Sequence, residues 1–393
     1  MIPREAIDAK EKNKAYAQVL LKSLTATPEE LEAIKKKLRL NPTPREVIYR
    51  EAAGKLYRFT PVKKKLHPVP LLIVPSLILK YYIMDLLKEH SLIESLVKQG
   101  VDVYLLDWGT PGPEYGHLTF DYYIDTFLRR AVRKVSRETG QEKINLLGQC
   151  LGGTLAAIFT SLYPDKVNRL VTLTTPVDFR DAGVLALWTN PETFDVDKVV
   201  DSFGDLVPAE FIHSCFQFLD LKATVERYKK LYNNVLDEYF LHYYQAMDTW
   251  VNDKIPFPGE VFRKFIKGLY QENQLAKGKF PINGRLANLA NITCPVQNII
   301  ARHDHVFPPK AAEAIDHLVG GPVESHTIDA GHVTLVALFP QRMETYELMG
   351  EFLTRREKEK KAPARTSSRT KESAGCGKTR GKCRKTSEKT KKT

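Results

Sequence analysis

Short apolar runs alternate along the chain with segments of helical spacing. The apolar runs have the length of buried strands and lie at residues 71–74, 101–106, 144–147, 170–173, 296–301 and 323–328. The segments that carry apolar residues at helical spacing lie at residues 84–99, 122–138, 151–163, 309–318 and 341–355. Because buried strands separated by helices are typical of a mostly parallel sheet covered on both faces, the pattern predicts an α/β fold.

This alternation stops between the fourth and fifth apolar runs. Residues 181–285 are rich in aromatic residues and helical patterns and contain no clear strand signal. We therefore expect a helical cap at 181–285, inserted into an α/β core formed by 61–180 and 286–356.

Two helix-start signals precede the core. Thr27-Pro28-Glu29-Glu30 has a capping Thr, a Pro at the first helical position and a Glu three residues after the Thr. Thr43-Pro44-Arg45-Glu46 repeats the pattern. Residues 1–60 are therefore predicted to form a helical arm that packs on the core.

The positive charge of the chain belongs to its C-terminal end. Residues 355–393 hold 16 Lys/Arg and 4 Asp/Glu, a net charge of +12 that equals the net charge of the whole chain. Residues 357–393 lack large apolar side chains, which predicts a disordered tail. Such a tail can be merely solubilising, or it can contact nucleic acid or another anionic surface. Cys376 and Cys383 lie there without a nearby His, so no metal site is expected.

The remaining composition favours a cytoplasmic protein. The first ten residues are charged and lack the apolar segment of a secretory signal. The strongest apolar run, 71–79, is interrupted by Pro75 and is far shorter than the roughly 20 residues that cross a membrane. The five cysteines are scattered and odd in number, which indicates a reducing compartment rather than a disulfide framework.

A candidate nucleophile lies between a predicted strand and a predicted helix. Gly148-Gln149-Cys150-Leu151-Gly152-Gly153 has the glycine spacing of the nucleophile elbow of α/β hydrolases, with a thiol in place of the usual hydroxyl. The helix start beside Cys150 favours the reactive thiolate. Taken alone, a cysteine between glycines is more often a buried structural residue, but the strand–turn–helix context favours catalysis.

Partners for Cys150 follow in the order that this fold requires. Asp304 comes after the apolar run 296–301, and His332 after the run 323–328, both at the carboxyl ends of strands where α/β sheets place ligand sites. We expect Asp304 to orient His332, and His332 to take the thiol proton. Asp329 is a second candidate for the acid, but it lies only three residues before His332.

Oxyanion stabilisation is expected from two backbone N–H groups. The first belongs to Leu151, the residue after the nucleophile. The second comes from the loop after the first core strand, and we assign it to Ile78. We expect that neither the reaction nor the fold needs a cofactor or a metal ion.

These residues resemble the polyhydroxyalkanoate synthases, acyltransferases that polymerise 3-hydroxyacyl-CoA into storage polyester. The resemblance spans residues 42–351 and rests on the elbow at 148–153, Asp-Trp-Gly at 107–109, Thr-Pro-Val-Asp-Phe at 175–179, Asp304-His305, Gly331-His332, and the cap segments 250–256, 259–265 and 270–273. It implies an α/β-hydrolase fold with an inserted helical cap. It also implies polymerisation of (R)-3-hydroxyacyl-CoA with release of CoA, through an acyl group carried on Cys150.

The short chain is similar to the class III and class IV members of that family. This similarity implies a second subunit of PhaE or PhaR type, self-association, and attachment to the surface of polyester granules. One departure is Leu79, which stands before Lys80 where many members have Asn. A cysteine-nucleophile thioesterase of the same fold is the main alternative, and a non-catalytic granule protein is a further one.

Overall fold

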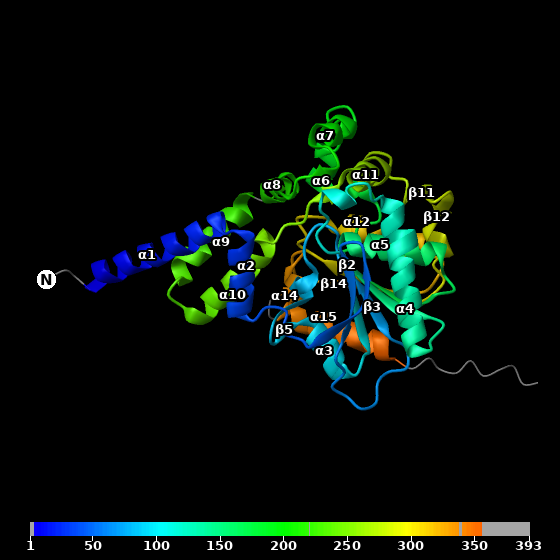
Figure 1. Cartoon of the computed structure of the whole chain (residues 1–393), viewed down its shortest axis with the longest axis horizontal. Helices are drawn as coiled ribbons and strands as arrows, with labels where there is room; N and C mark the ends of the chain where they lie inside the picture. Colours follow the sequence, from blue (N-terminus) through cyan, green and yellow to red (C-terminus); the bar gives the residue numbers. More distant parts are fainter. Residues whose placement is uncertain (1–3, 220, 338–339, 356–393) are drawn as a thin grey trace, which may run out of the picture. The chain divides into compact units, whose positions relative to one another are not determined.

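The central element is an eight-stranded sheet of strand order β1-β2-β6-β3-β7-β8-β13-β14 (Figure 1). The computed structural model describes residues 4–219, 221–337 and 340–355. Its strands are Arg45–Glu51 (β1), Gly54–Phe59 (β2), Leu71–Val74 (β3), Val103–Asp107 (β6), Ile144–Gln149 (β7), Val167–Leu173 (β8), Val296–Ala301 (β13) and Val323–Ile328 (β14). The six strands from β6 to β14 pair in parallel, which confirms the predicted parallel sheet. β1 and β2 extend it as an antiparallel edge.

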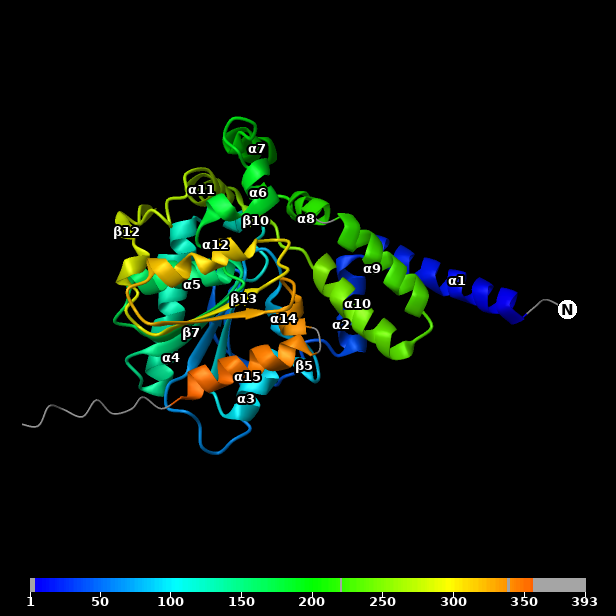
Figure 2. The ribbon, with the colours of Figure 1, turned by 180° about the vertical axis from the view of Figure 1, so that it is seen from behind.

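Helices cover both faces of this sheet (Figures 1 and 2). One core contains side chains of Arg129–Thr139 (α4), Leu151–Leu162 (α5), Pro309–Glu313 (α12) and Ile315–Leu318 (α13). The other contains side chains of Leu92–Gln99 (α3) and Gln341–Thr354 (α15). In β3, Leu72 and Val74 face the first core, and Leu71 and Ile73 face the second. This alternation explains why the parallel strands read as continuous apolar runs.

One helix-start signal is confirmed and the other is wrong. Thr27 forms a capping box with Glu30 at the start of Pro28–Leu38 (α2). Residues 43–60 instead lead into β1 and β2, so the arm predicted for residues 1–60 is not helical throughout. Thr43 does not start a helix because its hydroxyl is used in a tertiary contact, where it donates to buried Asp85 at 2.7 Å.

The predicted helix at 84–99 is shorter than expected. Only α3 is helical, and a small hairpin of Asp85–Leu87 (β4) and His90–Ser91 (β5), preceded by the 3-10 turn Tyr81–Met84 (η1), occupies the first half. Ser91 accepts from the backbone N–H of Glu94 at 2.8 Å and so starts the helix. The helix at 122–138 also differs, because a π-helical turn, Tyr122–Leu128 (η3), precedes α4.

The insertion between β8 and β13 is mainly helical. Its helices are Gly183–Trp188 (α6), Val196–Phe203 (α7), Ala209–Leu219 (α8), Leu221–Asn234 (α9), Glu238–Asn252 (α10) and Gly259–Lys264 (α11), followed by the π-helical turn Phe265–Gln271 (η5). Two short strand pairs were not predicted: Leu206–Val207 (β9) with Phe257–Pro258 (β10), and Phe280–Ile282 (β11) with Arg285–Ala287 (β12). They are shorter than the segments in which strand alternation can be recognised.

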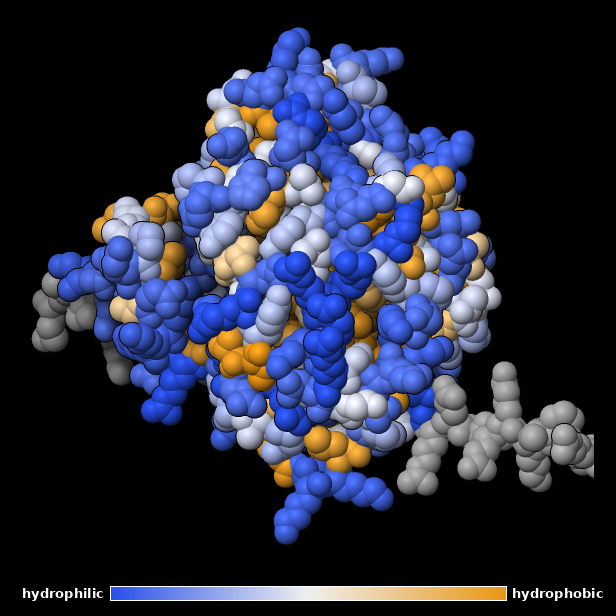
Figure 3. Space-filling view, turned by 45° about the vertical axis from the view of Figure 1, so that its right-hand side comes forward, coloured by the Kyte–Doolittle hydropathy of each residue, from blue (hydrophilic) through white to orange (hydrophobic). Residues whose placement is uncertain are grey.

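The N-terminal helix Arg4–Thr25 (α1) contacts the cap. Its Tyr16 meets Tyr232 of α9 edge to face, with 5.3 Å between ring centroids. In the part of the chain that the structure describes, no helix combines the length and the apolar character that crossing a membrane requires. Figure 3 shows hydrophobic residues in separate groups among hydrophilic ones on the face that it presents. The predicted disordered tail at 357–393 lies outside the described residues.

Candidate active site

The turn between β7 and α5 holds Cys150 in a strained conformation. Its φ of 54° and ψ of −131° lie in a region that residues with a side chain rarely adopt. The backbone N–H of Cys150 donates to the carbonyl of Leu173 at 2.9 Å, which ties the turn to the neighbouring strand β8. The elbow predicted from the sequence is therefore present, and it directs Cys150 to the carboxyl ends of the parallel strands.

Glycines are needed here because neighbouring backbone comes very close. A Cβ atom added to Gly148 would lie 2.3 Å from the Cα of Gly153. One added to Gly152 would lie 2.2 Å from the carbonyl oxygen of Val74 in β3. Since this second contact is with backbone rather than with a flexible side chain, it cannot be relieved by a rotamer change.

Gly152→Ala is therefore expected to destabilise the protein by about 3 kcal/mol or more. Helix propensity alone predicts the opposite, a gain of about 1 kcal/mol for Ala in a helix. Thermal unfolding followed by circular dichroism measures the difference. Gly140→Ala is the control, because this site is open and has a φ of 69°, so only the left-handed strain of about 1–2 kcal/mol applies. Equal losses in the two variants would contradict the steric argument.

Asp304 and His332 lie together beside the nucleophile. The His332 Nδ1 atom is 2.7 Å from Asp304 Oδ2, and both side chains are almost fully buried. The other carboxylate oxygen, Oδ1, accepts the backbone N–H groups of Val306 and Phe307 at 2.9 and 2.8 Å. The acid is thus fixed in place by its own loop, and its second oxygen faces the imidazole.

The rival carboxylate, Asp329, lies elsewhere. It is 78% exposed, and its Oδ1 is 2.7 Å from the Nε2 atom of His303, a residue that is itself largely exposed. Of the two candidate acids, only Asp304 contacts the imidazole of His332 in the described structure.

Electrostatics favour a charged imidazole. Burial lowers the pKa of His332, but the negative charges of Asp304 and of the Cys150 thiolate, together with hydrogen bonds to both, raise that pKa to about 10. Cys150 and His332 line the same cavity. An imidazole held by a buried carboxylate and facing the same cavity as a cysteine can activate that thiol as a nucleophile.

The two expected oxyanion donors belong to the residue after Cys150 and to a residue of the same cavity. Leu151 is the first residue of α5, so its N–H has no carbonyl within the helix to bind. Ile78 and Cys150 line the same cavity, but the Ile78 N–H donates to the hydroxyl of Ser76 at 3.3 Å. An oxyanion must replace this long hydrogen bond if Ile78 is to act as a donor.

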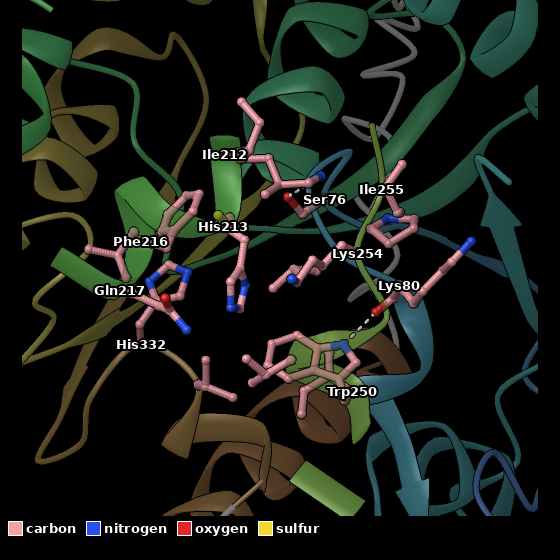
Figure 4. Close-up of a pocket in the computed structure, with 18 of the residues that line it drawn as sticks. Ser76, Lys80, Ile212, His213, Phe216, Gln217, Trp250, Lys254, Ile255 and His332 are labelled. Carbon is pink, nitrogen blue, oxygen red and sulfur yellow. Dashed lines mark hydrogen bonds between the residues drawn. The ribbon is translucent and has the colours of Figure 1, made fainter. Parts of the chain in front are cut away.

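The loop that carries Ile78 is held from two directions. The indole N–H of Trp108, in the Asp-Trp-Gly motif, donates to the carbonyl of Pro75 at 2.8 Å. From the cap, the indole N–H of Trp250 donates to the carbonyl of Lys80 at 2.7 Å (Figure 4). Leu79 forms an isolated antiparallel bridge with Lys254. The position at which Leu79 replaces the common Asn is thus a backbone contact between core and cap.

A cavity of about 290 Å³ opens above Cys150 and His332, between the core and cap helices α8, α9 and α10. Figure 4 shows His213 and Lys254 directed into it. Burial, together with the charges of Lys254 and Arg227, lowers the pKa of His213 to about 4, so this histidine is neutral at physiological pH. The sequence analysis did not assign these three residues to the site, although Lys254 lies in the cap segment 250–256, because the sequence does not show which cap side chains reach the nucleophile.

Comparison with known proteins shows which families this chain resembles. The family model of the alpha/beta hydrolase fold matches residues 69–336, and that of the N-terminus of poly-beta-hydroxybutyrate polymerase (PhaC) matches residues 19–96. Three similar proteins are each named poly(3-hydroxyalkanoate) polymerase subunit PhaC. That of Synechocystis sp. is 37% identical over 70% of this chain and 74% of its own length. That of Allochromatium vinosum is 35% identical over 80% and 89%.

The third, from Haloferax mediterranei, is 33% identical over 80% of this chain, which spans 64% of that relative's length. The matches to the Synechocystis and Allochromatium proteins cover most of both partners. The chain therefore belongs to the PhaC family of poly(3-hydroxyalkanoate) polymerase subunits, a family of enzymes with the α/β-hydrolase fold.

Proposed function

We propose that this chain polymerises (R)-3-hydroxyacyl-CoA into polyhydroxyalkanoate, with Cys150 carrying the acyl group and CoA leaving. The observation that carries the proposal is the buried pair of His332 and Asp304, which lies with Cys150 at one cavity beneath a helical cap, in a chain of this family. Catalysis uses Cys150 as nucleophile, His332 as acid and base, and Asp304 as the group that orients His332. No cofactor takes part in these steps.

Acylation begins from the thiolate–imidazolium pair. The Cys150 Sγ atom attacks the thioester carbonyl carbon, and the oxyanion that forms is stabilised by the N–H groups of Leu151 and Ile78. As the bond between this carbon and the CoA sulfur breaks, His332 donates its proton to that sulfur. CoA leaves as the free thiol, and the acyl group remains on Cys150.

Elongation returns the site to its starting state. The 3-hydroxyl of an incoming hydroxyacyl-CoA attacks the acyl thioester on Cys150, and neutral His332 accepts the hydroxyl proton. A new ester bond forms, and the Cys150 thiolate departs. The lengthened acyl-CoA then transfers its chain back to Cys150. Exchange between two thioesters is nearly balanced in free energy, so a thiol nucleophile keeps the chain transferable.

The charge of the cavity suits an acyl-CoA. Arg227 and Lys254 line it, and none of its lining residues carries a carboxylate. The phosphate groups of CoA are anionic, so such a cavity attracts the CoA end of the substrate. The cap also covers Cys150, which is only 8% exposed, and limits the access of water that would hydrolyse the acyl-enzyme.

A thioesterase with the same triad is the second candidate. It would use identical acylation chemistry and differ only in the group that accepts the acyl chain, water instead of a hydroxyl. Membership of the polymerase family and the cover over Cys150 favour the polymerase. A second subunit of PhaE or PhaR type, self-association, a cytoplasmic location and attachment to granules belong to this proposal through the family resemblance.

The decisive assay incubates the purified chain with 3-hydroxybutyryl-CoA, alone and with a PhaE or PhaR subunit, and measures CoA release and polymer together. The expected result is CoA release accompanied by insoluble polyester, accelerated by the second subunit. CoA release that yields only free 3-hydroxybutyrate would assign the chain to the thioesterases. Equal rates with and without the second subunit would contradict the proposed partner.

A further inference from the structure

A second cavity adjoins the catalytic one. It has a volume of about 520 Å³ and lies between α9, α10 and the short helix Thr334–Ala337 (α14), which follows His332. The two cavities share Arg227, Val251 and Val333 as lining residues. The two cavities therefore lie side by side, with these three side chains between them.

The second cavity changes in character along its length. Its middle is apolar and aromatic, with Tyr243, Tyr244, Met247 and Ala337 among its lining residues. Glu226 and Lys230 also line it, and both are exposed, so this end reaches the protein surface. The cavity thus extends from beside the catalytic cavity, along an apolar stretch, to solvent.

Two buried polar atoms of residues that line this cavity lack a hydrogen bond within the described structure: Asp248 Oδ1, which faces Arg227 Nη1 at 3.9 Å, and the hydroxyl of Tyr244. The hydroxyl of Tyr244 is buried and makes no hydrogen bond with any residue that the structure describes. A buried donor of this kind costs free energy unless a ligand supplies an acceptor. The neighbouring Tyr243 differs, because its hydroxyl already donates to the carbonyl of Ala337 at 3.2 Å.

We infer that this second cavity binds the growing polyester as it leaves Cys150, and that Tyr244 donates a hydrogen bond to an ester carbonyl of the chain. The inference rests on the proposed polymerase function and assigns separate paths to its two ligands. A polyester offers apolar carbon atoms and carbonyl acceptors but no donors, which matches an apolar lining with one free hydroxyl. The phosphates of CoA match the catalytic cavity, whose lining has no carboxylate, better than the second cavity, where Glu226 and Asp248 balance Arg227 and Lys230.

Arg227 stands at the junction of the two paths. Its Nη1 atom is 3.9 Å from Asp248 Oδ1, a distance at which the ion pair is weak, and its Nη2 atom donates to the hydroxyl of Tyr228 at 3.2 Å. Its guanidinium can hold the CoA of an incoming substrate on the catalytic side. In this scheme the polymer passes beside Arg227, along the apolar side chains of Val251 and Val333.

Met247→Trp tests this path, because Met247 is only half-buried and lines the second cavity but not the catalytic one. With 3-hydroxybutyryl-CoA, the acyl adduct on Cys150 should form within about threefold of the wild-type rate, while the mean product mass should fall at least tenfold. Met343→Trp is the matched control, since Met343 is exposed on α15 and outside both cavities. Circular dichroism verifies the fold of each variant.

Tyr244→Phe removes only the free hydroxyl. The product mass should fall about fivefold, the size expected for one lost hydrogen bond to the chain. The control Tyr239→Phe removes an exposed hydroxyl from the same helix and should leave the product mass unchanged. Wild-type product mass in folded Met247→Trp overturns the inference, and so does loss of the adduct itself, which would make the cavity a substrate entrance. Absence of an adduct in the wild type would instead refute the proposed function.

Discussion

Replacing Cys150 with alanine is expected to lower the rate of CoA release by a factor of about 10⁴ or more. The variant retains the oxyanion donors, the cavity and the Asp304–His332 pair, but it has no atom that can accept the acyl group. Intact-protein mass spectrometry, with samples quenched shortly after mixing with 3-hydroxybutyryl-CoA, measures the adduct directly. The wild type should gain one acyl group, and Cys150→Ala should gain none.

Two further cysteine variants make the result specific. Cys215→Ala should keep the adduct, because Cys215 lies on α8 and does not line the catalytic cavity. Cys150→Ser should fail to polymerise even where it acylates slowly, since an oxygen ester on Ser holds its acyl group more firmly than a thioester. An acylated Cys150→Ala protein would show that another residue is the nucleophile.

The local sequence pattern could predict those strands whose side chains are buried on both faces of the sheet. The parallel strands are continuous apolar runs, so β3, β7 and β13 were recognised from the sequence. The strands β1 and β2 were not, because Thr43 and Glu46 imitate a helix start whose capping hydroxyl is used by Asp85, 42 residues away. Asp85 has less than 1% of its surface exposed, and no local signal predicts which partner it takes.

A signal for the correct start of α3 was present but not used. Ser91 and Glu94 have the spacing of a capping box, and placing the helix start there would have excluded residues 84–90 from the helix. The hairpin β4–β5 before it is only a few residues long. Its pairing depends on contacts with η1, which is an irregular turn, and with α14, which is distant in sequence.

The candidate triad was predictable because the fold fixes its order and its place at the strand ends. The structure brings Asp304 and His332 into contact, as expected from the strands that precede them. The cap side of the site was not predictable. His213 and Arg227 reach the cavity only because α8 and α9 lie over it, and the sequence pattern of these helices is that of ordinary amphipathic helices. Lys254 follows α10 and is placed at the cavity by its backbone bridge to Leu79.

Asp304→Asn is expected to lower the rate of acylation by about 10²–10⁴-fold and to lower the pKa of His332. Burial lowers this pKa, and the charge of Asp304 is the largest influence that raises it to about 10. Without that charge, the imidazolium loses its proton at a lower pH. The alkaline limit of the single-turnover acylation rate should therefore move down from near pH 10, and NMR titration of ¹⁵N-labelled histidine should show the same shift.

The rival carboxylate supplies the control for this test. Asp329→Asn changes an exposed group that contacts His303, so it should leave the rate and the alkaline limit unchanged. Stability gives a second readout, because a pKa raised in the folded state stabilises the protein below the ordinary histidine pKa of about 6.5 and loses this effect as the pH rises through about 10. The difference in unfolding free energy between wild type and Asp304→Asn should shrink over that range. A difference that persists unchanged above pH 10 would mean that Asp304 supports the fold through its loop hydrogen bonds to Val306 and Phe307 rather than through His332.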